Sequence, residues 1–149
     1  MSRARTVSEE RRMGVPRRAV ETVVVGAGHS GLIVSRLLSQ AGREHLVVER
    51  RSSLGGGWQD RWDAFRLVSP NWITSVPGFD YRGTDPDGFM PRDEIVEHFR
   101  AYAEAIKAPV ELDTDVTKLV PLENGAARFR LTTSRGDIDA HSVIVAGGP

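Results

Sequence analysis

The hexapeptide Gly26-Ala27-Gly28-His29-Ser30-Gly31 carries the strongest chemical signal in the chain. It fits a GxGxxG pattern. In that pattern the first glycine permits a tight turn, the second lets backbone approach a pyrophosphate, and the third lets a helix pack closely on a strand. Amides at the start of a helix favour negative charge. The loop therefore predicts a site that holds the phosphates of a dinucleotide.

Glu49 is the second candidate, because it follows the last glycine of the hexapeptide by 18 residues. A carboxylate at that spacing accepts hydrogen bonds from ribose hydroxyls and repels a 2′-phosphate, which disfavours NADP at this site. The alternative is a solvent-facing acid paired with Arg50 or Arg51. Arg50 itself is expected either near the adenosine edge or simply exposed.

A second glycine cluster, Leu54-Gly55-Gly56-Gly57-Trp58, follows shortly after Glu49. Glycines expose backbone amides, and an adjacent aromatic ring can flank a ligand, so this cluster favours a second approach to the pyrophosphate. The alternative is an ordinary flexible turn.

A strand–helix–strand unit must position these residues. Val20–Val25 is a β-branched run that stops at the first glycine, as a buried parallel strand does. Apolar residues recur at helical spacing over Ser30–Gln40, and Gly42 supplies a C-terminal cap. His45–Glu49 is expected to be the second strand.

The rest of the chain supplies a helix and further strands. Arg50–Met90 has no regular periodicity; ligand wrapping is favoured, and unrecognised short elements are the alternative. A helix is expected from Pro91 to Lys107, with one apolar stripe formed by Ile95, Phe99, Tyr102 and Ile106. Later strands are expected at Val110–Leu112, Val116–Val120, Arg128–Thr133 and Ile138–Ala146.

This order of elements predicts an α/β fold, a Rossmann-like βαβ unit with a parallel sheet plus a β-meander. Residues 1–19 are expected to form a flexible leader, and residues 20–149 the domain. The chain stops on Gly147-Gly148-Pro149 directly after a buried strand. That ending predicts an incomplete, truncated domain.

Composition excludes several classes of function. Twenty basic and twenty acidic residues cancel, which argues against nucleic-acid and membrane partners. The chain has no cysteine, which excludes a CxxxxC redox pair within it. No apolar run is long enough to span a bilayer, and a cytoplasmic location is expected by default. No catalytic triad or metal cluster is recognisable, so no catalytic residue is assigned, no metal is predicted, and chemistry is expected to belong to a cofactor.

Four stretches together resemble flavin-containing monooxygenases and their relatives, which include YUCCA-type and Baeyer–Villiger monooxygenases. They are residues 23–32, Val47-Val48-Glu49-Arg50 with Gly55-Gly56-Gly57-Trp58, residues 67–78, and residues 143–148. The resemblance covers residues 20–148 but only the front portion of a typical member. It departs from the family pattern at Gly57 and Gly147, where threonine is usual.

The resemblance favours FAD over NAD(P) and implies a role for each matching position. Gly26, Ala27, Gly28, His29, Ser30 and Gly31 would hold the FAD pyrophosphate. Glu49 would bind the adenosine ribose, Gly56 and Trp58 the phosphate-to-flavin side, and Val116 the adenine through its backbone. Ala146 and Gly147 would pass beside the cofactor.

The resemblance also implies a reaction in a complete parent enzyme. NADPH would reduce FAD, a flavin C4a-hydroperoxide would form with O2, and one oxygen atom would enter a small-molecule substrate. The NADPH-binding domain is absent from these residues. The alternatives are another FAD-dependent oxidoreductase, such as an oxidase or desaturase, and an inactive truncated nucleotide-binding remnant. Oligomeric state is not predicted.

Overall fold

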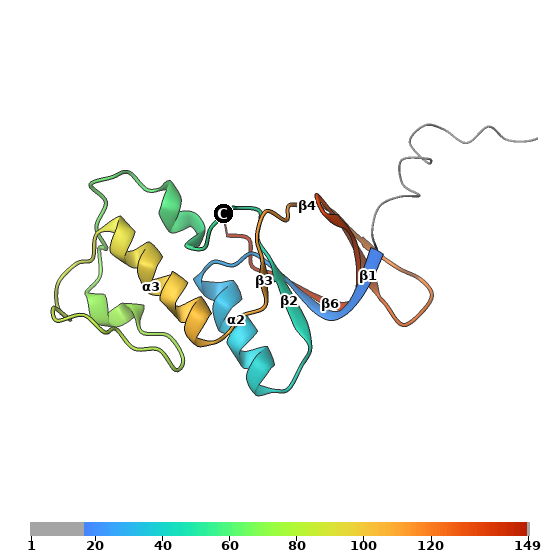
Figure 1. Cartoon of the computed structure of the whole chain (residues 1–149), viewed down its shortest axis with the longest axis horizontal. Coiled ribbons are helices and arrows are strands. Elements are labelled where there is room, and N and C mark those ends of the chain that lie inside the picture. The colour runs from blue at the N-terminus through green and yellow to red at the C-terminus, as the bar shows by residue number, and fades with distance from the viewer. Residues whose placement is uncertain (1–16, 149) are drawn as a thin grey trace, which may run out of the picture.

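The structure is a computed structural model that describes residues 17–148. Its centre is one six-stranded mixed sheet with the strand order β3-β2-β1-β6-β5-β4 (Figure 1). The elements in chain order are β1 (Arg17–Val25), α2 (His29–Gln40), β2 (His45–Val48), the 3-10 helices η1 (Gly56–Asp60) and η2 (Asn71–Thr74), α3 (Arg92–Ala105), β3 (Val110–Glu111), β4 (Val116–Pro121), β5 (Phe129–Thr133) and β6 (Gly136–Val145).

The parallel part of the sheet consists of β3, β2, β1 and β6. β1 lies between β2 and β6 and pairs in parallel with both, and β2 pairs in parallel with β3. The carboxyl ends of these strands therefore share one edge of the sheet, where ligands bind in open α/β folds.

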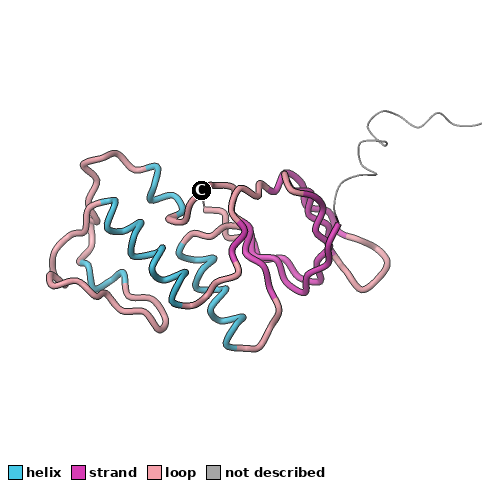
Figure 2. The backbone as a smooth tube through the Cα atoms, viewed as in Figure 1, coloured by secondary structure: helices cyan, strands magenta, loops and turns pink. Residues whose placement is uncertain are grey.

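The antiparallel part is the meander β4-β5-β6. β6 belongs to both parts, because β5 pairs with its first half, Gly136–Ala140, while β1 pairs along almost all of it. The predicted α/β fold, a parallel sheet plus a β-meander, is confirmed. Strands gather in one half of the molecule, and helices with the long loops occupy the other (Figure 2).

Alternating side chains of the central strands enter two separate cores. On β1, Val24 faces the helices and Val23 faces the meander, and on β2 the same split separates Val47 from Val48. Successive strand residues point to opposite faces of a sheet, so a run of valines is apolar on both sides. The consecutive valines at the ends of β1 and β2 are therefore buried on both faces of the sheet.

α2 connects β1 to β2 and begins directly at the first glycine loop. Its buried face contains Gly31, Leu32 and Ser35. Gly42 has a φ of +65°, and its N–H donates to the Ser39 carbonyl over 3.1 Å. The predicted glycine cap at the end of this helix is confirmed.

α3 supplies the other side of the helical core. The predicted stripe is confirmed, because Ile95, Phe99 and Tyr102 are buried and Ile106 packs against the same core. Figure 1 shows α3 on the side of α2 away from the sheet.

The long stretch Arg50–Met90 has two roles. It contains the short helices η1 and η2, which were the alternative to an uninterrupted loop. Only its first part, as far as Arg61, borders the cavity described below. Phe65, Leu67, Phe79 and Met90 instead fill the core beside α3. The second part does not border this cavity, and its large apolar side chains divide between that core and the surface, where Trp62, Val68 and Trp72 are exposed. Ligand wrapping by the second part stays a prediction.

Most predicted boundaries differ from the observed ones by one or two residues. The largest shift is at the first strand, which begins at Arg17, three residues before the predicted Val20. Arg17, Arg18 and Ala19 continue the pairing with β6, and Arg18 forms an ion pair with Glu111. Residues 1–16 of the predicted leader lie outside the described residues. Within residues 17–148, no helix is long and apolar enough to cross a membrane.

Candidate dinucleotide-binding site

The first glycine loop connects the end of β1 to the start of α2. Gly26 has a φ of +104°, and its N–H donates to the Val48 carbonyl over 2.8 Å. A Cβ on Gly26 would lie 2.4 Å from the Ala146 oxygen, and one on Gly31 would lie 1.9 Å from the Gly26 oxygen. Both positions therefore exclude any larger residue, as the fingerprint predicts.

Gly28 differs from the other two glycines of the pattern. It is the N-cap of α2 in an extended conformation, and a Cβ built on it would meet no atom within 4 Å. No side chain caps this helix and its first turn holds no acidic residue. The first amides of α2 are therefore left for another acceptor, as at anion-binding helix starts.

The second glycine cluster lies against the first. A Cβ on Gly56 would come within 3.0 Å of the Gly28 Cα, and Gly56 has a φ of +54°. The second cluster therefore packs backbone on backbone against the first glycine loop, and its approach to a pyrophosphate stays a prediction.

Glu49 lies just after β2 and is 5% exposed. Its Oε2 accepts a hydrogen bond from the Ala27 N–H over 2.9 Å, and its Oε1 accepts one from the Arg51 N–H over 3.0 Å. The carboxylate is thus fixed against the glycine loop by two backbone donors. Each carboxylate oxygen can accept more than one hydrogen bond, so capacity for ribose hydroxyls is retained. The alternative of a solvent-facing acid is wrong because the side chain is buried, but the pairing with Arg51 that it included is present, with Arg51 Nη1 3.9 Å from Glu49 Oε1.

These segments line one cavity of about 890 Å³. That volume is within the range of cofactor sites. Its lining comes from four parts of the chain: Val25, Gly26, Gly28, His29, Ser30 and Val34; Val48, Glu49, Arg50, Arg51, Gly56, Gly57, Trp58, Asp60 and Arg61; Thr114, Asp115 and Val116; and Ile144, Val145, Ala146, Gly147 and Gly148.

Two predicted site residues do not line the cavity. Ala27 is buried, and its N–H orients Glu49. Gly31 is buried where α2 crosses the loop. Both lie behind the cavity wall, because Ala27 belongs to the apolar core and a Cβ on Gly31 would point at the Gly26 oxygen.

Arginines give the cavity most of its positive charge. Arg50 is exposed at its edge, and Arg51 forms an ion pair with Asp60. The Arg61 guanidinium lies 5.9 Å from the centroid of the Trp58 ring, a cation–π distance. Trp58 is also packed against Phe65, with ring centroids 6.0 Å apart, so its position is set from both sides.

Thr114 and Val116 lie at the Glu49 end of the cavity. The Thr114 N–H donates to the Glu49 carbonyl over 2.8 Å, and the Asp113 N–H donates to the Arg51 carbonyl over 2.9 Å. Val116 starts β4 opposite Thr133, next to a register shift in the pairing. Val116 therefore lines the same end of the cavity as Glu49 and Thr114.

The end of β6 forms the remaining wall. The Ala146 N–H donates to the Val25 carbonyl over 2.7 Å, which holds Ala146 and Gly147 beside the first glycine loop. The structure thus brings both ends of the domain to the same cavity.

The sequence patterns do not mark five residues of the cavity lining as site residues: Arg51, Asp60, Arg61, Thr114 and Asp115. Asp60 and Arg61 are only two and three residues beyond Trp58, so continuing the motif by one helical turn would have found them. No local sequence signal marks Thr114, whose place depends on the contact between β2 and β3.

Histidines elsewhere make structural contacts. The Ser35 hydroxyl lies 2.8 Å from His45 Nε2, but Ser35 has no exposed surface, so a substrate cannot reach the pair. His98 Nε2 lies 2.9 Å from the Thr74 carbonyl, and burial lowers the pKa of His98 below its ordinary value. Within the described part of the chain, no group of three His, Asp or Glu side chains is arranged to hold a metal.

Comparison with known proteins agrees with this architecture. Residues 23–149 match the family described as pyridine nucleotide-disulphide oxidoreductase. A CzcO-like oxidoreductase of Geobacillus kaustophilus is 33% identical over 130 residues, covering 87% of this chain and 36% of that protein.

Solved structures give the same result. A flavin-containing monooxygenase from Stenotrophomonas maltophilia has a TM-score of 0.78 at 28% identity, covering 87% of this chain and 38% of that one. A steroid monooxygenase bound to NADP has a TM-score of 0.79 at 25% identity, covering 89% of this chain and 26% of that one.

The chain therefore spans about a third of the length of these relatives. The family match covers most of its residues and includes the whole βαβ unit, so the chain belongs to the pyridine nucleotide-disulphide oxidoreductase family and resembles the flavin monooxygenases and related oxidoreductases.

Proposed function

We propose that this chain is the FAD-binding part of an NADPH-dependent monooxygenase. The supporting observation is the single cavity that joins the glycine loop, Glu49, Trp58, Val116 and the end of β6. The similarity to flavin-containing and steroid monooxygenases favours FAD as the dinucleotide and a monooxygenase as the enzyme class.

The residues of the cavity fit FAD in three respects. A pyrophosphate can approach Gly28, where a Cβ would meet no atom within 4 Å, and can accept hydrogen bonds from the uncapped start of α2. The buried Glu49 carboxylate can accept the adenosine ribose hydroxyls, and its charge disfavours a 2′-phosphate. Trp58 can flank the part of the ligand beyond the phosphates.

The chain's own contribution is binding and orientation. When bound, FAD would supply electron transfer from NADPH and the activation of O2 for insertion of one oxygen atom into a small-molecule substrate. Backbone amides of α2 would hold the phosphates, and Glu49 would fix the ribose. NADPH, O2, the substrate and a cytoplasmic location belong to the proposal for the parent enzyme, in which this chain provides the FAD site.

FAD binding is tested on the purified chain. Heat release of any bound small molecule, followed by its absorbance spectrum and mass, should give FAD at close to one molecule per chain. Titration of the ligand-free protein should show binding of FAD and no binding of NADP at this site. Binding of NAD without FAD, or of neither, would contradict the proposal.

The enzyme class needs a separate test. The FAD-loaded parent enzyme, including its NADPH-binding domain, is incubated with NADPH, isotopically labelled O2 and small sulfide or ketone substrates. A monooxygenase transfers one labelled oxygen atom to the product. Reduction of the flavin by an amine or another substrate without NADPH, with release of H2O2, would instead indicate the alternative class of FAD-dependent oxidase.

A further inference from the structure

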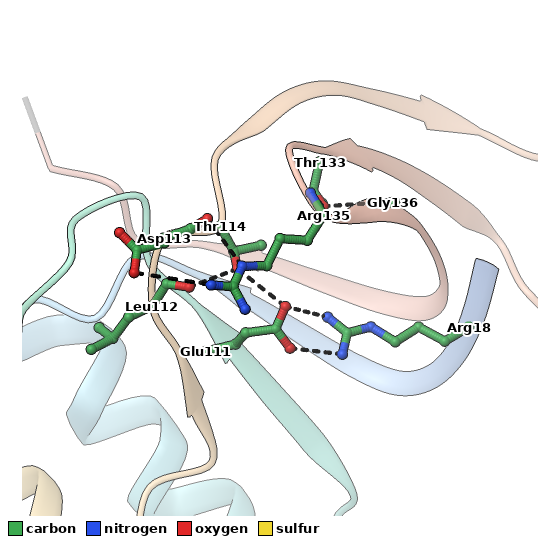
Figure 3. Close-up of polar contacts among 8 residues, drawn as sticks. All are labelled: Arg18, Glu111, Leu112, Asp113, Thr114, Thr133, Arg135 and Gly136. Carbon is green, nitrogen blue, oxygen red and sulfur yellow. Dashed lines mark hydrogen bonds and ion pairs between the residues drawn. The ribbon is translucent and has the colours of Figure 1, made fainter. Parts of the chain in front are cut away.

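A network of polar contacts surrounds the segment Asp113–Val116, which forms one end of the cavity. Figure 3 shows side chains from three elements meeting there: Arg18 of β1, Glu111 at the end of β3, and Arg135 in the turn between β5 and β6. None of these three side chains lines the cavity. Their contacts hold the segment Asp113–Val116 from outside the cavity.

One side of the segment is held through Glu111. Both carboxylate oxygens of Glu111 contact Arg18, at 2.8 and 2.7 Å (Figure 3). Hydrogen bonding to Arg18 keeps the pKa of Glu111 below its ordinary value, so the carboxylate is charged at neutral pH. The Thr114 hydroxyl, which is 1% exposed, lies 3.1 Å from Glu111 Oε1 and 3.0 Å from the Leu112 carbonyl. A buried hydroxyl between two acceptors fixes the local backbone.

The other side is held by the turn Ser134–Arg135. The Ser134 hydroxyl donates to the Asp113 carbonyl over 3.2 Å and accepts from the Asp115 N–H over 3.0 Å. Arg135 Nε also donates to the Asp113 carbonyl, over 3.3 Å. Asp113 has a φ of +53°, a conformation that costs energy in a residue with a side chain unless its surroundings impose it. The turn supplies these surroundings.

We propose that Thr114, held by Glu111 and Arg18, and Ser134 are positioning residues for the adenosine end of the dinucleotide. This rests on the proposed function. Glu49 marks the ribose position, and the Thr114 N–H contacts the Glu49 carbonyl over 2.8 Å, so a shift of the segment displaces the wall beside the ribose. The network holds Asp113–Val116 ready for the ligand, which lowers the ordering cost of binding.

The test compares two variants that remove one hydroxyl each on opposite sides of the segment. Thr114→Val and Ser134→Ala are each expected to weaken binding of FAD and of ADP about three- to tenfold, the effect of one hydrogen bond. Thr114→Ser and Ser134→Thr keep the hydroxyls and should bind both ligands like the wild type. Wild-type binding by these two variants would not be expected if the side chains acted only through their packing volume.

Ser75→Ala is the matched control. Ser75 is exposed and its hydroxyl accepts a backbone N–H from Tyr81 over 3.1 Å, as Ser134 does from Asp115, but it lies outside the cavity lining. This variant should bind FAD and ADP like the wild type. Urea unfolding of every variant at the titration temperature checks that the ligand-free protein is folded.

The outcomes separate this inference from the proposed function. If wild-type protein binds FAD or ADP and both hydroxyl-removing variants bind equally tightly, the positioning role is wrong. If it binds ADP and not FAD, the flavin assignment fails, and the ADP series still decides the positioning role. If it binds neither ligand, both proposals are overturned.

Discussion

At the scale of single residues, the three glycines of the GxGxxG pattern have different physical roles. Gly26 and Gly31 have no room for a Cβ because protein backbone occupies that space. Gly28 has room, and its φ of −71° is open to any residue, so protein packing alone does not explain a glycine there. The space beside Gly28 belongs to the cavity, which suits the close approach of a ligand.

The Gly28→Val variant should fold normally and lose FAD. Its branched side chain would enter the cavity where the pyrophosphate approaches, without meeting protein atoms within 4 Å of its Cβ. The measurement is flavin content after purification, with thermal unfolding of the ligand-free protein beside it. Flavin occupancy equal to that of the wild type would remove the pyrophosphate assignment.

Gly31→Ala serves as the structural counterpart. Its Cβ would lie 1.9 Å from the Gly26 oxygen, so α2 or the loop must move. Although alanine favours a helix interior over glycine by about 1 kcal/mol, the clash should dominate and lower the unfolding temperature. A more stable Gly31→Ala protein would show that the loop adapts more readily than its close contacts imply.

Glu49→Ala should weaken FAD binding and also lower stability. The variant removes the acceptor for ribose hydroxyls and leaves the Ala27 and Arg51 amides without their partner. Each effect is expected to be about 1–3 kcal/mol. Calorimetric titration with FAD measures the first, and urea unfolding of the ligand-free protein measures the second.

Asp60→Ala is the control for Glu49→Ala. Asp60 is also a carboxylate of the cavity, but its side chain is 64% exposed and paired with Arg51. Exposed ion pairs contribute less than about 1 kcal/mol, so both effects should be small. Equal losses in the two variants would show that Glu49 acts only through its charge.

At the scale of elements, β5 and β6 are joined by an opposed pair of charged residues. Arg130 faces Asp139 across the strands, with nitrogen–oxygen distances of 2.6 and 2.9 Å. Hydrogen bonding to Arg130 lowers the pKa of Asp139 below its ordinary value. Because β6 also pairs with β1, this contact connects the meander to the parallel sheet.

The Arg130–Asp139 pair predicts a loss of stability in acid. A carboxyl group whose pKa is lower in the folded than in the unfolded state stabilises the fold at neutral pH, and that contribution disappears as the pH falls through the folded-state pKa. Asp139→Asn should therefore reduce the free energy of unfolding at pH 7 and flatten its decrease below about pH 4. Urea unfolding at a series of pH values measures both.

Glu97→Gln is the matched change in an exposed ion pair. Glu97 pairs with Arg100 on the surface of α3, where both side chains are about half exposed or more. Its effect on the free energy of unfolding should stay within about 0.5 kcal/mol. If Asp139→Asn behaves the same way, the pair does not stabilise the junction of the strands.

At the scale of the whole molecule, the cavity joins segments from the beginning, middle and end of the domain. A ligand that contacts all of them binds only the folded chain. FAD at 100 times its dissociation constant should then add about 2.7 kcal/mol of stability. For a domain of this size, that corresponds to a rise of roughly 5–11 °C in unfolding temperature.

Thermal unfolding with FAD and with FMN measures this whole-molecule effect. FMN lacks the adenosine half, so it should raise the unfolding temperature less at the same concentration. The Gly28→Val protein, as the control, should show no rise with FAD. An equal rise with FMN would mean that the Glu49 end of the cavity takes no part in binding.

The βαβ unit and its glycine loop could be predicted from the amino-acid sequence alone. The signals there are local: a β-branched run, three glycines at fixed spacing, an amphipathic helix with Gly42 after it, and Glu49 at the end of the next strand. Each of these signals reflects a backbone conformation or a burial pattern that is determined by residues close together in the sequence. The apolar stripe of α3 was predictable for the same reason.

The surroundings of that unit could not be predicted in this way, because they depend on contacts between segments far apart in the chain. Arg17–Ala19 became strand because β6, more than a hundred residues later, pairs with them. Phe65, Leu67, Phe79 and Met90 pack in the core beside α3 and do not line the cavity. Thr114 reaches the site because β3 places it beside Glu49. These placements depend on contacts between segments far apart in the chain. Such contacts stabilise the protein only once it has folded, and they produce no periodic pattern in the local sequence.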